Sequence, residues 1–394
     1  MAISDQSPVT TALTKSQELV PTLRARAAEV EQLREVPKDL MDAVAETGVI
    51  RMMVPPEYGG IEANLEDVHE ILATIGLGDG SVAWVAAVLT AITWAAGLFP
   101  DAAQDQIFAN PDVRVCGVVA PTGRTERKGD GYIVSGKWPF VSGCRNADWA
   151  ILGSIIDYPD SGPSPAFVLI PVRDLEIQDD WDVSGLQGTG SSSVTTEGTF
   201  VHEDFTMNLV KGLQDVYPCR RHQDHWLYRA PLSAMLQALS IGAIVGNARH
   251  GVELFRDRLG KRPLTYTSYE KASEAPVNHL RLSEALLKID SGELLGRQLF
   301  QDIDRAARTG QRLDVEARAR SRAVGGYATY LCREAILMLN SGSGASSIYR
   351  ATSAMQRIVR DQETFSLHSL LNASTGHELY GRVLCGMEPN TIVL

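Results

Sequence analysis

GYIVSGKWPFVSG (131–143) decides the fold class, because it is a strand-forming run in a chain whose two ends follow a helical pattern. Asp130-Gly131 at its start is typical of a hairpin turn. Further short runs rich in Val, Ile and aromatic residues are VRVCGVVAP (113–121), WAILGSIID (149–157) and AFVLIPV (166–172). No helix of useful length is expected before Phe205, so the middle of the chain is predicted to be an all-β barrel or sandwich. We predict the barrel.

The segment before this β module follows a helical pattern. Thr14 and Gln17 form a possible capping box for a first helix. Helices are then expected over residues 39–49, 65–75, 82–99 and 101–109, with the loop VPPEYGG (54–60) between the first two of these. We predict an N-terminal helical domain over residues 1–112.

The eighteen residues Val82–Phe99 carry no charge and come close to the length of a membrane span. The stretch is rich in Ala, contains Thr90, Thr93 and Gly97, and is flanked by acidic residues. It also stands alone in a chain of near-zero mean hydropathy. A helix that is apolar on all sides inside a large protein explains it better, so we predict a buried helix and no membrane partner.

After about Gln214 the helical period returns and persists to the C-terminus. Two runs with three- and four-residue spacing lie near Leu282–Ile303 and Val324–Met338, and a break rich in Pro and Tyr spans 261–276. This pattern predicts a β domain over 113–212 and a C-terminal four-helix bundle over 213–394. The fold class is therefore α+β, with helices, a β-barrel and a helical bundle in that order.

The formal net charge of −11 argues against binding to nucleic acid or to anionic membrane surfaces. The five cysteines are scattered and lack a CxxC pair, which is typical of reduced intracellular thiols. The N-terminus lacks the charged and apolar regions of a signal peptide. We therefore expect a cytoplasmic protein.

Several common catalytic motifs are absent from the sequence. The loops GTGSSS (188–193) and GSGASS (342–347) lack the third glycine of a dinucleotide-binding fingerprint, and neither a P-loop nor a G-x-S-x-G elbow occurs. His222 and His225 could approach a metal ion, but a third convincing ligand is missing. A polar loop is the favoured interpretation, and we predict no metal site.

Three segments are candidates for chemistry. His368 lies among apolar residues that would keep it neutral, as a general base requires, although a packed structural histidine is the commoner case. The segment 138–143 contains a proline that exposes backbone N–H groups to a planar heterocycle, or it is an edge strand. The loop 185–193 could cradle a phosphate or a flavin edge, or only face solvent.

These segments occur in a familiar order. VPPEYGG (54–60), GKWPFVSGCRNADWAILG (136–153), WDVSGLQGTGSSSV (181–194) and MQRIVRD with a following histidine (355–368) together resemble the acyl-CoA dehydrogenase superfamily. Within it the chain is most similar to the oxygenase component of two-component, flavin-dependent monooxygenases (group D). The likeness covers nearly the whole chain. It implies a homotetramer, usually assembled through the C-terminal bundles.

The resemblance implies an enzyme that accepts reduced FMN or FADH₂ from a separate NAD(P)H:flavin reductase. Reduced flavin and O₂ then form a C4a-hydroperoxyflavin that hydroxylates a small aromatic, phenolic or polyketide-like substrate. An alternative with the same chemistry is N-hydroxylation of an amine or amino sugar. Two functions without oxygen transfer also stay open, namely a flavin dehydrogenase and a non-catalytic relative that serves as a scaffold.

The same resemblance assigns roles to individual residues. His368 would accept the substrate proton or assist oxygen activation, and Ser142 would bond near flavin N5. The other expected cofactor-binding residues are Trp138, Phe140, Thr189, Ser191, Arg262 and Arg360, with Asp361 helping Arg360 to orient the site. The expected substrate pocket contains Trp94, Ile92 and Phe365.

Two differences from the family pattern bear on the reaction. The segments 341–350 and 231–238 contain no Glu or Asp, so the carboxylate base of the dehydrogenases is missing. This absence favours an oxygenase. The histidine that several family members carry on the apolar helix is also missing, because residues 92–95 are Ile-Thr-Trp-Ala. The substrate pocket is therefore expected to be more apolar.

Overall fold

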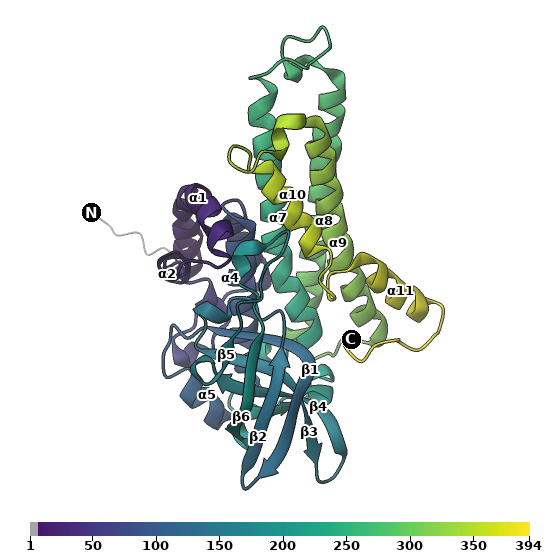
Figure 1. Ribbon diagram of the computed structural model, residues 1–394. Coiled ribbons are helices and arrows are strands. Elements are labelled where there is room, and N and C mark those ends of the chain that lie inside the picture. Colours follow the sequence, from purple (N-terminus) through teal and green to yellow (C-terminus); the bar gives the residue numbers. More distant parts are fainter. Residues whose placement is uncertain (1–6) are drawn as a thin grey trace, which may run out of the picture.

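The computed structural model describes residues 7–394 and places one β-sheet beside two groups of helices (Figure 1). The N-terminal helices are α1 (Pro8–Leu33), α2 (Lys38–Glu46), α3 (Leu65–Gly76), α4 (Gly80–Ala96) and α5 (Asp101–Ile107). The strands are β1 (Val115–Lys128), β2 (Gly131–Trp138), β3 (Trp149–Tyr158), β4 (Gly162–Pro171), β5 (Glu176–Ile177), β6 (Val194–His202) and β7 (Thr206–Asn208). The remaining helices are α6 (Leu209–Leu213), α7 (Leu232–Leu259), α8 (Pro276–Thr309), α9 (Val315–Gly342), α10 (Met355–Phe365) and α11 (Ala373–Leu384).

The sheet has seven strands in the order β5-β6-β2-β1-β3-β4-β7 and is open. The predicted hairpin is confirmed, because Lys128 pairs with Gly131 where β1 turns into β2. The predicted barrel is not confirmed. Its edge strands β5 and β7 are two and three residues long, too short to pair along their length and close the sheet.

Helix α1 begins earlier than predicted. The side chain of Ser7 accepts a hydrogen bond from the backbone N–H of Thr10 and caps the helix, and a proline follows Ser7 at the first helical position. The capping box predicted at Thr14 and Gln17 is wrong, because the Thr14 hydroxyl donates to the carbonyl of Thr10 inside the helix.

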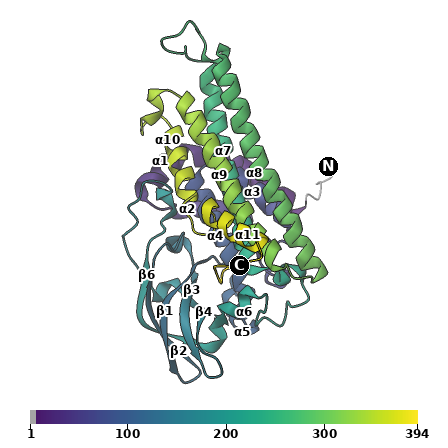
Figure 2. The same cartoon turned by 90° about the vertical axis from the view of Figure 1, so that its right-hand side faces the viewer.

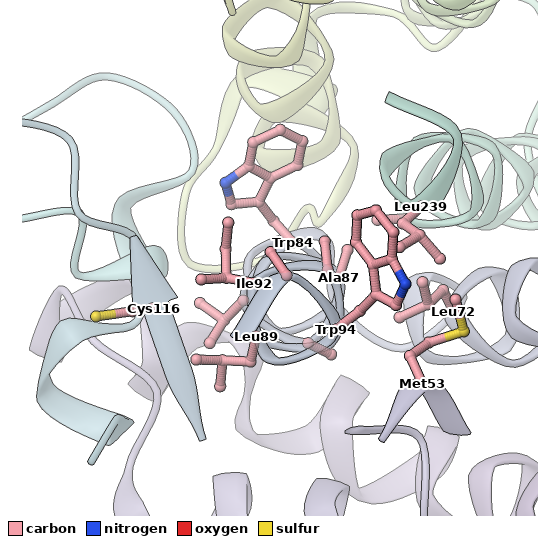
Figure 3. Packing of buried hydrophobic residues seen from close by; sticks show 14 of the residues in the cluster. Met53, Leu72, Trp84, Ala87, Leu89, Ile92, Trp94, Cys116 and Leu239 are labelled. Atoms are coloured by element: carbon pink, nitrogen blue, oxygen red, sulfur yellow. The ribbon is translucent and has the colours of Figure 1, made fainter. Parts of the chain in front are cut away.

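Helix α4 is the buried helix that the sequence predicts. Every residue of α4 except Val88 is buried, and its side chains reach toward the sheet on one side and toward α3 and α7 on the other (Figure 3). Trp94 donates its indole N–H to the carbonyl of Leu227 at 3.0 Å. Within residues 7–394 no helix combines the length and apolar character needed to cross a bilayer.

The C-terminal helices α7, α8 and α9 pack along one another, while α10 lies against α7 and α9 and α11 lies against α9 (Figure 2). The other face of α7 packs tightly on α3. A Cβ atom on Gly246 would lie 2.0 Å from the carbonyl oxygen of Ala73, and one on Gly242 would lie 2.6 Å from that of His69. These two glycines therefore let the backbones of α3 and α7 approach closely and fix α3 against the bundle.

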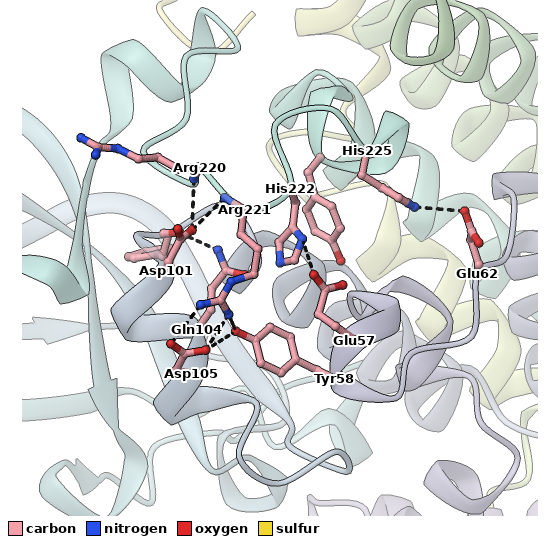
Figure 4. Close-up of polar contacts among 12 residues, drawn as sticks. Glu57, Tyr58, Glu62, Asp101, Gln104, Asp105, Arg220, Arg221, His222 and His225 are labelled. Carbon is pink, nitrogen blue, oxygen red and sulfur yellow. Dashed lines mark hydrogen bonds and ion pairs between the residues drawn. The ribbon is translucent and has the colours of Figure 1, made fainter.

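Polar contacts attach the segment between sheet and bundle to the N-terminal helices (Figure 4). The carboxylate of Asp101 accepts the backbone N–H groups of Arg220 and Arg221, each at 3.1 Å, and the Arg221 guanidinium pairs with Asp105 at 2.5 Å. The two bonds from Asp101 go to the main chain and therefore fix the path of the segment, while the ion pair with Asp105 neutralises the charge of Arg221.

His222 and His225 lie in this segment, and each pairs with its own glutamate. His222 Nδ1 lies 3.0 Å from Glu57 and His225 Nε2 lies 3.0 Å from Glu62 (Figure 4). Across residues 7–394 no group of three or more His, Cys, Asp or Glu residues is arranged to hold a metal ion. The two histidines thus join the segment to the VPPEYGG loop, through Glu57, and to the residues that follow this loop, through Glu62.

Candidate active site

Two glycine- and serine-rich segments meet beyond the end of β2. The Val141 N–H donates to the carbonyl of Ser192 at 3.2 Å, and the Gly143 N–H donates to the carbonyl of Thr189 at 3.1 Å. Phe140 and Gly143 adopt left-handed backbone angles, with φ of 63° and 72°. These angles turn the chain sharply after the proline, so that the segment 138–143 leaves the sheet and runs beside the loop 185–193.

Three buried hydroxyl groups form a continuous row where the segments meet. Ser142 Oγ lies 2.7 Å from Ser191 Oγ, which lies 2.7 Å from Thr189 Oγ1. The Trp84 indole N–H donates to Ser142 at 3.2 Å, and the Thr189 hydroxyl donates to the carbonyl of Leu186 at 2.8 Å. We call Trp84, Ser142, Ser191, Thr189 and Leu186 the hydroxyl chain.

Trp84 also brings the C-terminal part of the chain to this row. Its ring lies 5.4 Å from the ring of buried Phe365 and 5.3 Å, edge to face, from the ring of His368 (centroid distances). Residues from α4, from the segment after β2, and from α10 and the turn after it therefore converge on one place, although they are far apart in the sequence.

His368 is exposed to solvent, although its ring packs edge to face on Trp84. Loss of hydration lowers its pKa to about 4, and the nearby Arg322 charge acts in the same direction. The ring is consequently neutral at physiological pH. The Leu370 N–H approaches His368 Nδ1 at 3.4 Å, which places the ring proton on Nε2. His368 thus presents a donor, and accepts a proton once this weak contact is released.

Helix α10 contacts the loop 185–193 and holds it in place. The Asp361 carboxylate accepts the backbone N–H of Leu186 at 2.7 Å, and Leu186 has a left-handed φ of 53°. Arg360 donates to the carbonyl of Ser184 at 2.7 Å and to Glu31 at 2.6 Å. Arg360 therefore anchors the start of the loop, and these contacts direct its guanidinium to protein groups, while its predicted cofactor-binding role stays a prediction.

Burial raises the pKa of Asp361 to about 7, and the neighbouring Asp79 adds to the effect. Among residues 7–394 no group bonds to Asp361 Oδ2, which is buried. The carboxyl that supports the loop is therefore close to its titration midpoint at neutral pH.

An aromatic surface lies outside the hydroxyl chain. The Phe140 side chain is 66% exposed and meets the half-buried Trp181 edge to face, with ring centroids 6.1 Å apart. Exposed aromatic faces beside hydrogen-bonding groups suit a planar heterocycle such as isoalloxazine. Ser142 fits such a ring as well, because its oxygen keeps one lone pair unused by the chain.

Three predicted site residues lie elsewhere in the core. Trp94 is fully buried and points to a different side of α4 from Trp84, toward Leu72 and Leu239 (Figure 3), so it lies apart from the hydroxyl chain and its place in a substrate pocket stays a prediction. Trp138 is fully buried inside the sheet and donates to the carbonyl of Gly153 at 2.6 Å. Ile92 is nearly buried and faces β1.

Arg262 lies far from the hydroxyl chain. It belongs to the loop between α7 and α8, at the end of the bundle remote from the sheet (Figure 1). There it donates to the Ser346 hydroxyl at 2.6 Å, and Arg258 donates to the same oxygen at 2.7 Å. Within one copy of the chain, Arg262 does not join the other predicted cofactor-binding residues.

The sequence-based prediction missed Trp84, which contacts Ser142, Phe365 and His368. The only sequence signal was a large aromatic residue near the start of an apolar helix. That signal cannot identify the side of the helix on which a site forms, because α4 is apolar on all sides.

The sequence of this chain is similar to those of known flavin enzymes and of acyl-CoA dehydrogenases. The chain matches the acyl-CoA dehydrogenase N-terminal domain over residues 17–109 and the acyl-CoA dehydrogenase C-terminal domain over residues 238–373. It is 32% identical to the flavin-dependent monooxygenase oxygenase subunit HsaA of Rhodococcus jostii, covering 92% of this chain and 95% of that protein.

Two further comparisons concern flavin. The chain is 28% identical to the oxygenase component of an FADH₂-dependent resorcinol hydroxylase from Rhizobium sp., covering 93% of this chain and 92% of that protein. The structure of XiaF from Streptomyces sp. in complex with FADH₂ and glycerol superposes with a TM-score of 0.90 at 26% identity, covering 97% of each chain. The chain therefore belongs to the flavin-dependent monooxygenase oxygenase subunits, which have the acyl-CoA dehydrogenase fold.

Proposed function

We propose that this protein is the oxygenase component of a two-component monooxygenase that uses reduced flavin and O₂ to hydroxylate a small aromatic or polyketide-like substrate. One observation carries the proposal. Through Trp84, the hydroxyl chain meets Phe365 and His368 at one place. The similarity to HsaA and to the resorcinol hydroxylase supports it.

The proposed cofactor is reduced FMN or FADH₂, delivered by a separate NAD(P)H:flavin reductase. When bound, it supplies the electrons that activate O₂ for transfer of one oxygen atom. Ser142 would accept a hydrogen bond from the edge of the flavin, and Phe140 with Trp181 would pack on the ring. The names of the relatives, oxygenase subunit and oxygenase component, support a separate reductase.

The proposed substrate lies between the flavin edge and His368. Trp84 and Phe365 would supply apolar surroundings that exclude water from the reacting groups. Neutral His368 would hold a phenolic oxygen through Nε2–H, or take its proton once the contact from Leu370 opens. A phenolate is the more nucleophilic form and would react faster with an electrophilic oxygen.

We propose a cytoplasmic homotetramer whose domains span 1–112, 113–212 and 213–394. Leu280, Leu287 and Leu294 are exposed at seven-residue intervals along α8, which supports a contact between bundles. In such an assembly Arg262, at the remote end of α7, would reach the flavin phosphate of a neighbouring copy. This placement reconciles its predicted role with its distance from the other site residues.

A reconstitution experiment tests the proposal. The purified chain is mixed anaerobically with reduced FMN or FAD, then with oxygen and a panel of phenols, polycyclic aromatics and amines. We expect a product heavier by one oxygen atom from an aromatic substrate, and none when oxidised flavin replaces the reduced form. Oxidation of the flavin without any oxygenated product across the panel would contradict the proposal.

A further inference from the structure

We infer that Ser191 and Thr189 are positioning residues that fix the direction of the Ser142 hydroxyl and so make the site distinguish reduced from oxidised flavin. The inference deepens the proposed function and rests on it. It concerns the protons of the hydroxyl chain, whose two oxygen–oxygen distances of 2.7 Å are those of well-formed hydrogen bonds.

The two ends of the hydroxyl chain are groups that act in one direction only. At one end the Trp84 indole N–H can only donate, and at the other the Leu186 carbonyl can only accept. A hydroxyl group has one proton to give. Thr189 gives its proton to Leu186, so Ser191 must donate to Thr189, and Ser142 must in turn donate to Ser191.

This order leaves Ser142 without a proton for a ligand. Its hydroxyl proton points to Ser191 and one lone pair receives the Trp84 N–H, so a single lone pair remains. A bound molecule therefore meets an acceptor at this position. Reduced flavin carries a hydrogen on N5 and can donate to it, whereas oxidised flavin has a bare N5 that is itself an acceptor. The site consequently favours the reduced form.

The cost of reversing the order sets the size of the effect. In the reversed order each hydroxyl group donates toward the ligand, so the Thr189 hydroxyl no longer donates to the Leu186 carbonyl. That carbonyl still accepts the Thr189 backbone N–H at 3.1 Å and the Trp181 indole N–H at 3.3 Å. One hydrogen bond is thus lost in binding oxidised flavin. A loss of this kind corresponds to about a tenfold preference for the reduced form.

The loop is held firmly enough to impose this order. The Asp361 carboxylate accepts the Leu186 N–H, and Arg360 donates to the carbonyl of Ser184, two residues earlier. Thr189 and Ser191 are buried, so water has little access to replace either hydroxyl group as a partner. The direction is therefore set by protein groups rather than by solvent.

The test measures the dissociation constants of oxidised and anaerobically reduced FMN and FAD for the wild-type protein and four variants. In Ser191→Ala the Ser142 hydroxyl is free to donate. In Thr189→Val the side-chain bond to the Leu186 carbonyl is already absent, so the remaining hydroxyl groups can reverse without losing a further hydrogen bond. Both changes should lower the ratio of oxidised to reduced dissociation constants about tenfold. The reduction potential of the bound flavin should fall together with that ratio, by about 30 mV for each tenfold decrease.

Two variants serve as matched controls. Thr189→Ser keeps a hydroxyl group at the same place and should restore the wild-type ratio. Ser192→Ala removes a buried hydroxyl from the same loop but from outside the hydroxyl chain, and should leave the ratio unchanged. Unchanged ratios in both Ser191→Ala and Thr189→Val would overturn the inference while leaving the proposed function intact. A wild-type protein that binds no reduced flavin would instead refute the proposed function.

Discussion

Replacing Asp361 by Asn should make the protein more stable at alkaline pH. Asp361 Oδ1 accepts the Leu186 N–H at 2.7 Å, and the Asn side-chain oxygen can keep that bond. The other carboxyl oxygen, Oδ2, is buried and bonds to no group within residues 7–394, so the amide that replaces it breaks no hydrogen bond. The substitution therefore changes mainly the charge.

The charges around Asp361 explain why its ionisation is unfavourable. The small internal space beside it is lined by Glu31, Asp79, Arg357 and Arg360. With Asp361 this makes three carboxyl groups against two guanidinium groups, in a place with little water. Burial and Asp79 raise the pKa of Asp361 from 3.8 to about 7. One proton held in this cluster balances its charge.

The sign of the pH effect follows from the raised pKa. Between about pH 4 and pH 7 the folded protein holds the proton on Asp361 and the unfolded chain does not, so stability falls as pH rises through this window. Three pKa units correspond to an upper bound of about 4 kcal/mol, reached above pH 7. Asn carries no charge at any of these pH values, so Asp361→Asn should lose this slope.

The assay is the thermal midpoint of unfolding for wild-type protein and Asp361→Asn between pH 5 and pH 8.5. We expect the variant to be the more stable protein at pH 5 already, with a difference in midpoint that widens steadily up to about pH 7 and is largest at pH 8. Asp160→Asn, in the exposed turn between β3 and β4, is the control and should follow the wild type throughout. A variant less stable than the wild type at pH 8 would refute the reasoning, because it would mean that the ionised carboxylate stabilises the fold.

Three other predictions follow from contacts in and near the site. Trp84→Phe keeps an aromatic ring but removes the donor to Ser142, so urea denaturation should show a loss of about 1 kcal/mol; an unchanged midpoint would contradict the contact. His368→Gln should lower the amount of product formed per flavin oxidised. In the wild-type protein this yield should be constant from pH 6 to pH 8, because the pKa of His368 is about 4; a yield that changes with a midpoint near pH 6.5 would contradict the lowered pKa. Arg318→Met leaves the buried Asp215 without its cation and should cost about 3–5 kcal/mol, with the larger loss at pH 8 than at pH 5, measured as a shift in the unfolding midpoint.

Much of the fold could be predicted from the sequence because the local signals are strong. The Asp130-Gly131 hairpin, the buried helix α4 and the break between α7 and α8 all follow from residues that are close together in the chain. Closure of the sheet could not be predicted in this way. It depends on whether edge strands far apart in the sequence are long enough to pair, and β5 and β7 are short.

The candidate site depends on contacts of a different kind. Ser142 and Ser191 lie in loops whose composition is equally typical of solvent-exposed turns, and only the fold brings their hydroxyl groups to 2.7 Å. The choice between Trp84 and Trp94 depends on how α4 is rotated, which its uniformly apolar sequence does not specify. The resemblance to known enzymes located the two loops, while the three-dimensional packing identified Trp84 as their partner.

The most direct test of the central claim uses isotopically labelled O₂. The protein is mixed with anaerobically reduced flavin and an aromatic substrate from the reconstitution panel, and labelled oxygen is then added. The account predicts one labelled oxygen atom in the product, with less product from His368→Gln at equal flavin oxidation. A product whose added oxygen comes from water, or a substrate that loses hydrogen without gaining oxygen, would contradict it.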